Sequence, residues 1–150
     1  MAQNGRFGLS LKILTVLASE PGAMRTSAAI AKELKQSAVM VRRCFLLLHR
    51  QGLIEQRKGP NGGARLKLPA RMIGLGDVFL ASEENWMVFD DSAIVGLLKR
   101  TREAGVLAMN QTTLAHVVKR VKKQSIVKTE DARSSSAPSL DRASSSDSAL

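Results

Sequence analysis

Two adjacent arginines, Arg42 and Arg43, are the residues whose type and spacing point most directly to chemistry. They stand near the start of a segment with helical apolar periodicity, and a second basic group follows at Arg57, Lys58 and Arg65. A guanidinium donates paired hydrogen bonds to a phosphate or to one edge of guanine, and a lysine adds a point charge. These side chains predict contact with a polyanion such as double-stranded DNA.

Residues that would support catalysis or metal binding are not arranged for it. The two histidines, His49 and His116, lack acidic neighbours at ligand spacing, and the sequence contains no H-E-x-x-H, G-K-[ST] or G-x-S-x-G motif. The Gly-rich residues 59–63 are not followed by the Lys-Ser/Thr pair of a phosphate-binding loop. We predict that the protein is not an enzyme.

The stretch that must position the basic side chains, residues 26–68, has the pattern helix, turn, helix, hairpin. Thr26 or Ser27 can cap the first helix and Ser37 can cap the second, because a hydroxyl accepts from free backbone N–H groups. Gly52 is expected to end the second helix in a left-handed conformation. This order of elements is that of a winged helix-turn-helix.

The second helix of this stretch has one apolar face. Val41, Phe45 and Leu48, with Leu53 a turn later, should pack inward. Residues 53–57 and 64–68 then alternate apolar and polar, as half-buried strands do, around a turn at residues 59–63. The remaining circumference of the helix, which includes its N-terminal end, carries Val39, Met40, Arg42, Arg43, Leu46 and Arg50.

Four short motifs follow one another in this stretch: S-x-x-I-A (Ser27, Ile30, Ala31), S-x-x-x-V-R-R (Ser37, Val41, Arg42, Arg43), G-L-I (Gly52, Leu53, Ile54) and R-K-G-x-x-G-G-x-x-L (Arg57, Lys58, Gly59, Gly62, Gly63, Leu66). This ordered set resembles the IscR/NsrR/CymR (Rrf-two) family of dimeric bacterial transcription regulators, and the resemblance covers roughly residues 8–124. It implies a mainly α fold with a small β-hairpin wing, that is, a winged helix-turn-helix followed by a long C-terminal dimerisation helix.

Ten residues are predicted to contact DNA. Those on the second helix should face base edges or nearby phosphates of the major groove, and those of the hairpin should face phosphates or the minor groove. The set comprises Thr26, Ser27, Ser37, Met40, Arg42, Arg43, Arg50, Arg57, Lys58 and Arg65.

The charge distribution favours a polyanionic partner. The chain has 150 residues and a formal net charge of +10. Residues 1–75 hold 13 Lys and Arg against 3 Asp and Glu, whereas residues 76–150 hold 10 of each. The whole excess therefore lies in the half with the helix-turn-helix. A basic surface that serves only solubility is the alternative.

The remaining composition indicates one domain with an aliphatic core, since 44% of residues are hydrophobic and only 3% are aromatic. The single cysteine, Cys44, excludes an intramolecular disulfide. No run of about 20 apolar residues would span a membrane, and the first residues lack the apolar segment of a secretion signal. We expect a bacterial, cytoplasmic protein.

The flanking segments should support residues 26–68; the DNA-binding domain that they complete, residues 1–83, is called the head. Residues 9–18 are expected to form a first helix that Ser10 can cap. Residues 76–82 suggest a short helix, and the acidic residues 83–91 that follow are irregular. Trp86 lies in the only aromatic-rich patch, which either covers the core or lines a small cavity. Asp90, Asp91 or Ser92 can cap the next helix.

Residues 84–124 are predicted to form a dimerisation region after the DNA-binding domain at residues 1–83. A helix over residues 92–109, the longest helical pattern in the chain, carries a wide apolar stripe that is expected to form the dimer seam. Packing of the stripe against its own domain is the alternative. A last helix spans residues 113–123, and the Ser-rich residues 125–150 should be disordered. The stripe consists of Ile94, Leu97, Leu98, Ala104 and Leu107.

The sequence departs from the family's pattern in two places. Many members hold a two-iron cluster on three cysteines near the start of the dimerisation helix, but residues 90–109 contain no cysteine. We therefore expect no cofactor, as in the cluster-free branch. His116 stands where the family's T-L-A-D phrase has Asp. Cys44 beside Arg43 is either a redox switch with a lowered pKa or a buried structural thiol.

These observations together predict a homodimeric, sequence-specific DNA-binding regulator that represses by covering a promoter. Its operator would be a pseudo-palindrome with half-sites about 34 Å apart. The alternatives are a non-specific architectural or RNA-binding protein and a winged-helix scaffold for protein interactions. The effector is undetermined: the candidates are a small molecule near Trp86, oxidation of Cys44 and a partner protein.

Overall fold

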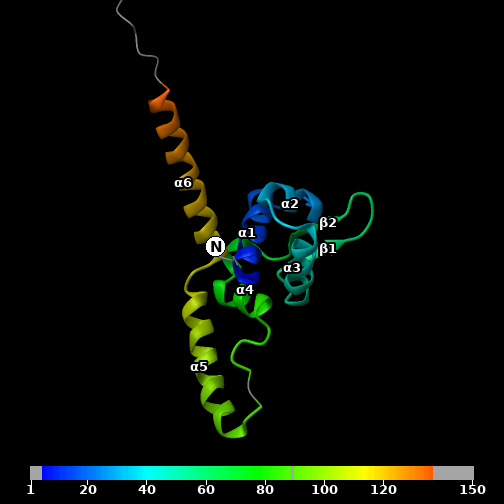
Figure 1. Cartoon of the computed structure of the whole chain (residues 1–150), viewed down its shortest axis with the longest axis vertical. Helices are drawn as coiled ribbons and strands as arrows, with labels where there is room; N and C mark the ends of the chain where they lie inside the picture. The colour runs from blue at the N-terminus through cyan, green and yellow to red at the C-terminus, as the bar shows by residue number, and fades with distance from the viewer. Residues whose placement is uncertain (1–4, 89, 137–150) are drawn as a thin grey trace, which may run out of the picture. The chain divides into compact units, whose positions relative to one another are not determined.

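The computed structural model describes residues 5–88 and 90–136. Residues 5–119 belong to one compact unit, and residues 120–136 belong to a second. The described chain is mainly helical with one small sheet, which confirms the predicted fold class (Figure 1). The elements are α1 (Arg6–Ser19), α2 (Ser27–Leu34), α3 (Ala38–Arg50), β1 (Ile54–Arg57), β2 (Gly63–Leu66), the 3-10 turn η1 (Ala70–Met72), α4 (Leu75–Ser82), α5 (Ser92–Asn110) and α6 (Leu114–Ser135).

Helices α1, α2 and α3 pack around an aliphatic core. Fully buried side chains come from all three helices, for example Ile13, Ile30 and Leu48, and from the sheet at Ile54. Burying each such side chain contributes about 1.5–3 kcal/mol, so this core fixes the relative positions of the helices. Helix α1 begins at Arg6, which corrects the expectation that Ser10 caps it: Ser10 lies inside the helix and is buried.

The turn between α2 and α3 spans residues 35–37. Thr26 is the N-cap of α2, and its Oγ1 accepts a hydrogen bond from the N–H of Ala29 at 3.1 Å. Lys35 ends α2 in the left-handed conformation with φ of 54°. Ser37 then takes the N-cap position of α3, but its side chain makes no capping hydrogen bond. The predicted cap position is correct, whereas the predicted bond is not formed.

Helix α3 ends as predicted, and the sheet follows at once. Gly52 has φ of +73°, and the N–H of Leu53 donates to the carbonyl of Leu48 at 3.0 Å, which closes the helix end. The two strands pair antiparallel, with Ile54 opposite Leu66. The hairpin projects from the helices as a wing, here the segment at residues 54–66 (Figure 1).

A segment before α2 anchors the wing. The N–H and carbonyl of Arg25 both bond to Ala64, at 2.9 and 2.8 Å. Gly63 has φ of +137°, and a Cβ there would lie 2.5 Å from the carbonyl oxygen of Arg25. Only glycine permits this close approach, so the base of the wing is held against the start of α2.

Helices α4 and α5 pack together in the first unit. Gly74 and Gly76 lie so close to Asn110 of α5 that an added Cβ would come within 2.0 and 2.7 Å of its Oδ1. The N–H of Asp77 donates to the same oxygen at 3.2 Å. Phe79 of α4 makes edge contacts with Phe7 and Trp86, at centroid distances of 5.3 and 4.9 Å. Trp86 therefore packs against α4, whereas its neighbours Met87 and Val88 line a cavity, so both predicted alternatives apply to parts of the patch.

Helix α6 runs to Ser135, whereas the sequence interpretation ended it near residue 123 and expected disorder from residue 125. With this extension α6, not α5, is the longest helix of the described chain. The predicted tail beyond residue 136 lies outside the described residues. None of the helices in the described ranges combines the length and low polarity that a membrane span needs.

Candidate nucleic-acid interface

The outer face of α3 carries residues that are predicted to contact DNA. Because Val41, Cys44, Phe45 and Leu48 are buried on the other side, the helix has no freedom to turn this face inward. The exposed face has no acidic residue, and its apolar side chains suit contact with thymine methyl groups. It presents Val39, Met40, Arg42, Arg43 and Leu46, with the apolar members 64%, 38% and 48% exposed at Val39, Met40 and Leu46.

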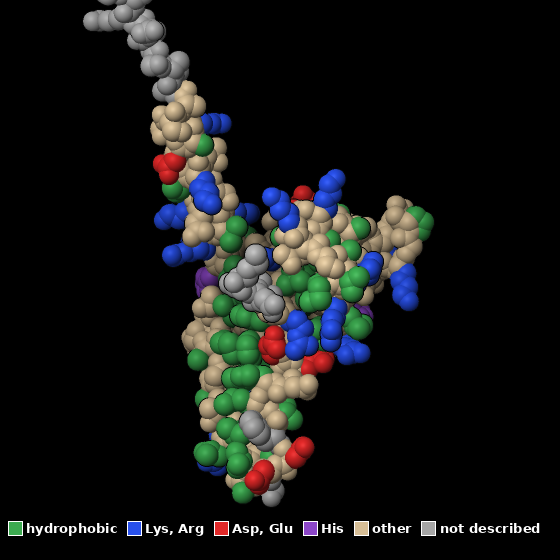
Figure 2. All heavy atoms as spheres, in the orientation of Figure 1, with side chains coloured by type: hydrophobic (Ala, Val, Ile, Leu, Met, Phe, Trp, Pro, Cys, Tyr) green, Lys and Arg blue, Asp and Glu red, His purple; other side chains and the backbone are tan. Residues whose placement is uncertain are grey.

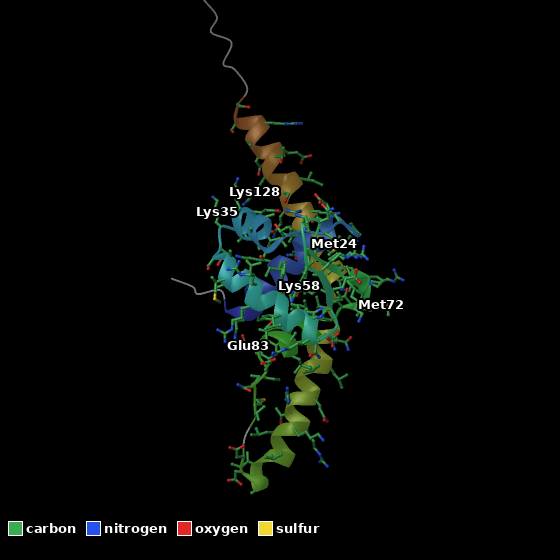
Figure 3. The ribbon with its side chains drawn as sticks, turned by 90° about the vertical axis from the view of Figure 1, so that its right-hand side faces the viewer. Met24, Lys35, Lys58, Met72, Glu83 and Lys128 are labelled. Atoms are coloured by element: carbon green, nitrogen blue, oxygen red, sulfur yellow. The ribbon has the colours of Figure 1, made fainter. Side chains whose placement is uncertain are left out.

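A groove of about 450 Å³ lies between this face, the start of α2 and the wing. It brings together five of the ten predicted DNA-contacting residues, which come from three separate parts of the chain. Figure 3 looks along the wing toward α3, with Lys58 labelled in front of the helix. The groove is lined by Thr26, Ser27, Arg42, Phe45, Leu46, Gln56, Arg57, Lys58, Gly59, Gly62 and Gly63.

The start of α2 adds backbone donors to this groove. The Oγ1 of Thr26 satisfies the N–H of Ala29, but the first turn of any helix leaves further N–H groups without intrahelical partners. These groups and the helix dipole favour a phosphate oxygen at this position. The predicted roles of Thr26 and Ser27 therefore have a geometric basis.

Ion pairs neutralise the acidic side chains in the part of the head before α4. The three acidic residues of residues 5–75 all pair with arginines: Glu20 and Glu33 with Arg25, at 3.5 and 2.5 Å, and Glu55 with Arg65. Within the described ranges, no ion pair involves the arginines and lysine of α3's outer face and the wing, Arg42, Arg43, Arg57 and Lys58. Figure 2 shows Lys and Arg side chains at the top and lower edge of the head and on the wing.

Two predicted site residues are engaged elsewhere. Arg65 pairs with Glu55 across the sheet and donates to the carbonyl of Gly22 at 3.5 Å. Arg50, at the C-terminal end of α3, lies 3.6 Å from Glu84. Both pairs are partly exposed and contribute little to stability, so either arginine can exchange its partner for a phosphate.

Cys44 lies on the buried side of α3, with no exposed surface. Burial raises the pKa of its thiol, and the Ser10 hydroxyl and the charges of Arg6 and Arg43 only partly oppose this effect. The geometry therefore favours the structural-thiol interpretation over the redox switch.

The predicted dimer stripe lies on α5, none of whose described side chains is buried. Ile94, Leu97 and Ala104 are exposed, with Leu97 at 70%, and Leu107 is 67% exposed further round the helix. Leu98 is half-buried. Hydrophobic side chains run along α5 on the face that Figure 2 shows.

Sequence interpretation missed two contributors to the head. Gln56 lines the groove, and the strand pattern gives no signal for it, because Gln56 shares its strand face with buried Ile54. The side chain of Arg25 forms ion pairs with two of the three acidic residues, and its backbone pairs with Ala64 of the wing. No local pattern reveals that contact, because its partner Ala64 is distant in sequence.

An exposed helix of a helix-turn-helix, flanked by a hairpin that lines the same groove, defines a winged helix-turn-helix protein. The sequence profile of the Rrf2 family, described as "Iron-dependent Transcriptional regulator", matches residues 4–125. The chain belongs to this family of transcriptional regulators.

Individual relatives agree with this assignment. The chain is 31% identical over 85 residues to the HTH-type transcriptional regulator IscR of Cereibacter sphaeroides; the match spans 56% of this chain and 55% of that protein. The chain thus aligns with about half the length of the curated relatives it matches. Among solved structures it is similar to the global cysteine regulator CymR of B. subtilis, with a TM-score of 0.61 at 23% identity over 80% of this chain and 98% of that one. Similarity to T. potens IscR is comparable, with a TM-score of 0.62 at 20% identity over 83% and 90%.

The family's description raises the question of iron, and the residues present do not fit a thiolate-ligated cluster. This sequence has one cysteine, and it is buried in the core of the head. In the part of the chain that the structure describes, no three His, Cys, Asp or Glu side chains gather as metal ligands.

Proposed function

We propose that this protein is a homodimeric, sequence-specific DNA-binding regulator that represses transcription by covering a promoter. The observation that carries the proposal is the groove in which the α2 start, Arg42 of α3, and Arg57 and Lys58 of the wing converge. Helix α3 would enter a major groove with Arg42 and Arg43 toward base edges. The wing would follow phosphates or the adjacent minor groove.

The charge arrangement supports DNA over an acidic protein. The basic side chains lie on elements spaced along one groove, and no carboxylate on the outer face of α3 would repel phosphates. Base recognition needs arginines whose guanidinium groups are available, which Arg42 and Arg43 satisfy. An arginine bidentate to guanine supplies about 1–3 kcal/mol of discrimination.

The exposed seam of α5 supports a dimer. Side chains that are exposed in the single chain recur along α5 at alternating spacings of three and four residues: Ile94, Leu97, Thr101, Ala104 and Ala108. This is the spacing of a two-helix seam, and the small residues would allow close approach. Two heads related by a two-fold axis would read half-sites about 34 Å apart.

Selection of bound sequences from random duplex DNA, at about physiological salt, tests the proposal. We expect a pseudo-palindrome whose half-sites lie about one helical turn apart. Bound DNA without a shared motif would contradict sequence specificity and indicate an architectural protein. Absence of DNA binding would indicate a protein-interaction scaffold.

A further inference from the structure

A second concave region lies far from the wing in the first unit, where α4 and residues 83–88 face α5. It consists of two adjoining cavities of about 560 and 220 Å³. Both are lined by Lys99 and Arg102 of α5, so the two cations stand at their junction. The first also contains Leu80, Glu103, Val106 and Leu107, and the second contains Met87, Val88 and Val95.

The two cations lack the partners that such groups normally have. Neither Lys99 nor Arg102 forms an ion pair in the described ranges. The Nε of Arg102 is buried, and no acceptor lies within hydrogen-bond distance of it among the described residues. Burying an arginine nitrogen without a hydrogen-bond acceptor costs free energy, so we expect an acceptor to bind at this position. Glu103 lines the larger cavity only and does not supply one.

The walls are shaped by contacts that hold residues 83–88 against α5. Gly105 leaves room for Trp86, which an added Cβ would approach to 3.3 Å, and Trp86 is fixed by its edge contact with Phe79. Met87 adopts a left-handed conformation with φ of 55°. Such a strained conformation in a residue other than glycine costs about 1–3 kcal/mol and persists where surrounding contacts impose it, often at ligand clamps.

We propose that these cavities bind a small organic carboxylate with an apolar body. The carboxylate would accept paired hydrogen bonds from Arg102 and the charge of Lys99. The apolar body would lie against Leu80 and Val106 in the larger cavity. Pockets of a few hundred Å³ with mainly apolar walls and a few convergent polar groups are typical of small-molecule sites.

The site is connected to the head through packed side chains. Trp86 contacts Phe79, Phe79 contacts Phe7 of α1, and α1 packs against α3 through the core. Binding of the carboxylate would therefore alter operator affinity, and the operator would alter carboxylate affinity by the same factor. This coupling alone rests on the proposed function, whereas the binding itself does not.

Fluorescence titration of the full chain with 1-anilinonaphthalene-8-sulfonate, an aromatic anion, tests the site without DNA. We expect one probe per chain, displaced by octanoate at least tenfold more effectively than by octan-1-ol. Arg102→Gln should weaken probe binding at least tenfold. Arg100→Gln removes the same charge from an exposed position of α5 that lines neither cavity, and it should change the affinity less than twofold.

Three results would overturn the proposal. One is equal effects of the Arg102 and Arg100 substitutions, and another is equal displacement by octanoate and octan-1-ol. The third is an Arg102→Gln variant that shifts the monomer–dimer equilibrium in sedimentation but leaves probe affinity intact; it would assign the acceptor of Arg102 to a carboxylate of a second copy. If Arg102→Gln fails to fold, Lys99→Gln is expected to weaken octanoate displacement and leave octan-1-ol displacement unchanged.

Discussion

Arg42 and Arg43 differ from Arg25, Arg50 and Arg65 of the same head because no carboxylate in the described ranges neutralises them. An arginine already paired with a carboxylate must give up that pair before it can bind a base edge. The proposed specificity therefore belongs to Arg42 and Arg43, and the paired arginines are assigned to phosphates at most.

The double variant Arg42→Ala/Arg43→Ala is expected to lose operator preference while its folding is unchanged. Each guanine contact contributes about 1–3 kcal/mol, so loss of both should lower the ratio of specific to non-specific affinity by at least about thirtyfold. Both side chains are exposed, so the midpoint of urea unfolding should stay the same. Gel-shift titrations with operator and scrambled duplexes measure the ratio. Arg50→Ala, on the same helix, is the matched control, and an equal loss there would refute the assignment.

Cys44 shows how burial sets reactivity at a single residue. Its thiol has no exposed surface, and its pKa is raised, chiefly by burial. The folded chain should therefore resist iodoacetamide at neutral pH and react only on unfolding. Wild-type protein that is alkylated as fast as a free thiol would contradict this.

The raised pKa of Cys44 also fixes the direction of a pH effect. Above the unfolded thiol's pKa of about 8.5, the unfolded chain loses this proton before the folded chain does. The free energy of unfolding should therefore fall as pH rises from 8.5 toward the higher folded pKa. Urea unfolding across this range, compared with Cys44→Ala, isolates the contribution of the thiol, which should be absent in the variant.

At the scale of elements, α4 and α6 begin with the same kind of side-chain hydrogen bond. In α4 the carboxylate of Asp77 accepts from the N–H of Gly74 at 3.1 Å. In α6 the Nδ1 of His116 accepts from the N–H of Thr113 at 3.1 Å. Each acceptor lies three residues after the cap position, as in a capping box. The departure from the family's T-L-A-D phrase thus replaces one acceptor by another.

Substitution of His116 tests this capping role. His116→Ala should lower the free energy of unfolding by about 1 kcal/mol, a typical cost of a lost helix cap. His116→Asp restores an acceptor and adds a negative charge at a helix N-terminus, so it should be at least as stable as wild type. Urea titrations followed by circular dichroism give both values. An Ala variant as stable as wild type, or an Asp variant less stable than Ala, would remove His116 from this role.

The elements also show which features a sequence can predict. Helices α1 to α3 and the wing are predictable because their apolar periodicities and the glycines at residues 52, 59, 62 and 63 are local signals. The left-handed Lys35 and the bridge from Arg25 to Ala64 were not, since tertiary packing imposes them. The length of α6 was underestimated because low apolar content was taken as disorder. No Gly or Pro interrupts residues 114–136, and a helix needs only local hydrogen bonds.

For the candidate site, the sequence supplied the residue types but not their partners. The outward face of α3 followed from periodicity, because burial on one side determines exposure on the other. The engagement of Arg50 and Arg65 with Glu84 and Glu55 depends on distances between elements, which spacing along the chain does not reveal. The same holds for the cavities at Lys99 and Arg102, where loop and helix converge.

At the scale of the whole molecule, the proposed function depends on a second copy of the chain. One head offers a single recognition helix and wing, and single DNA-binding modules bury only about 600–1,000 Å², which is small for a specific complex. Joining two heads makes the second binding event intramolecular, which can raise affinity by about 10²–10⁴-fold. The exposed seam of α5 is the described surface best suited to make that connection.

Leu97→Glu separates the two copies if this seam is the interface. Leu97 is 70% exposed in the single chain, so the charge costs nothing in the monomer but would be buried in the dimer. We expect the variant to sediment as a monomer with an unchanged unfolding midpoint, and to bind a full pseudo-palindrome no better than about one-hundredth as tightly as wild type. Its affinity for a single half-site should equal that of wild type, because the head is intact.

Met72→Glu places the same charge at a 60% exposed apolar side chain outside α5 and should remain dimeric. A Leu97→Glu protein that stays dimeric would exclude the α5 seam, while loss of half-site binding as well would show that α5 also supports the fold of the head.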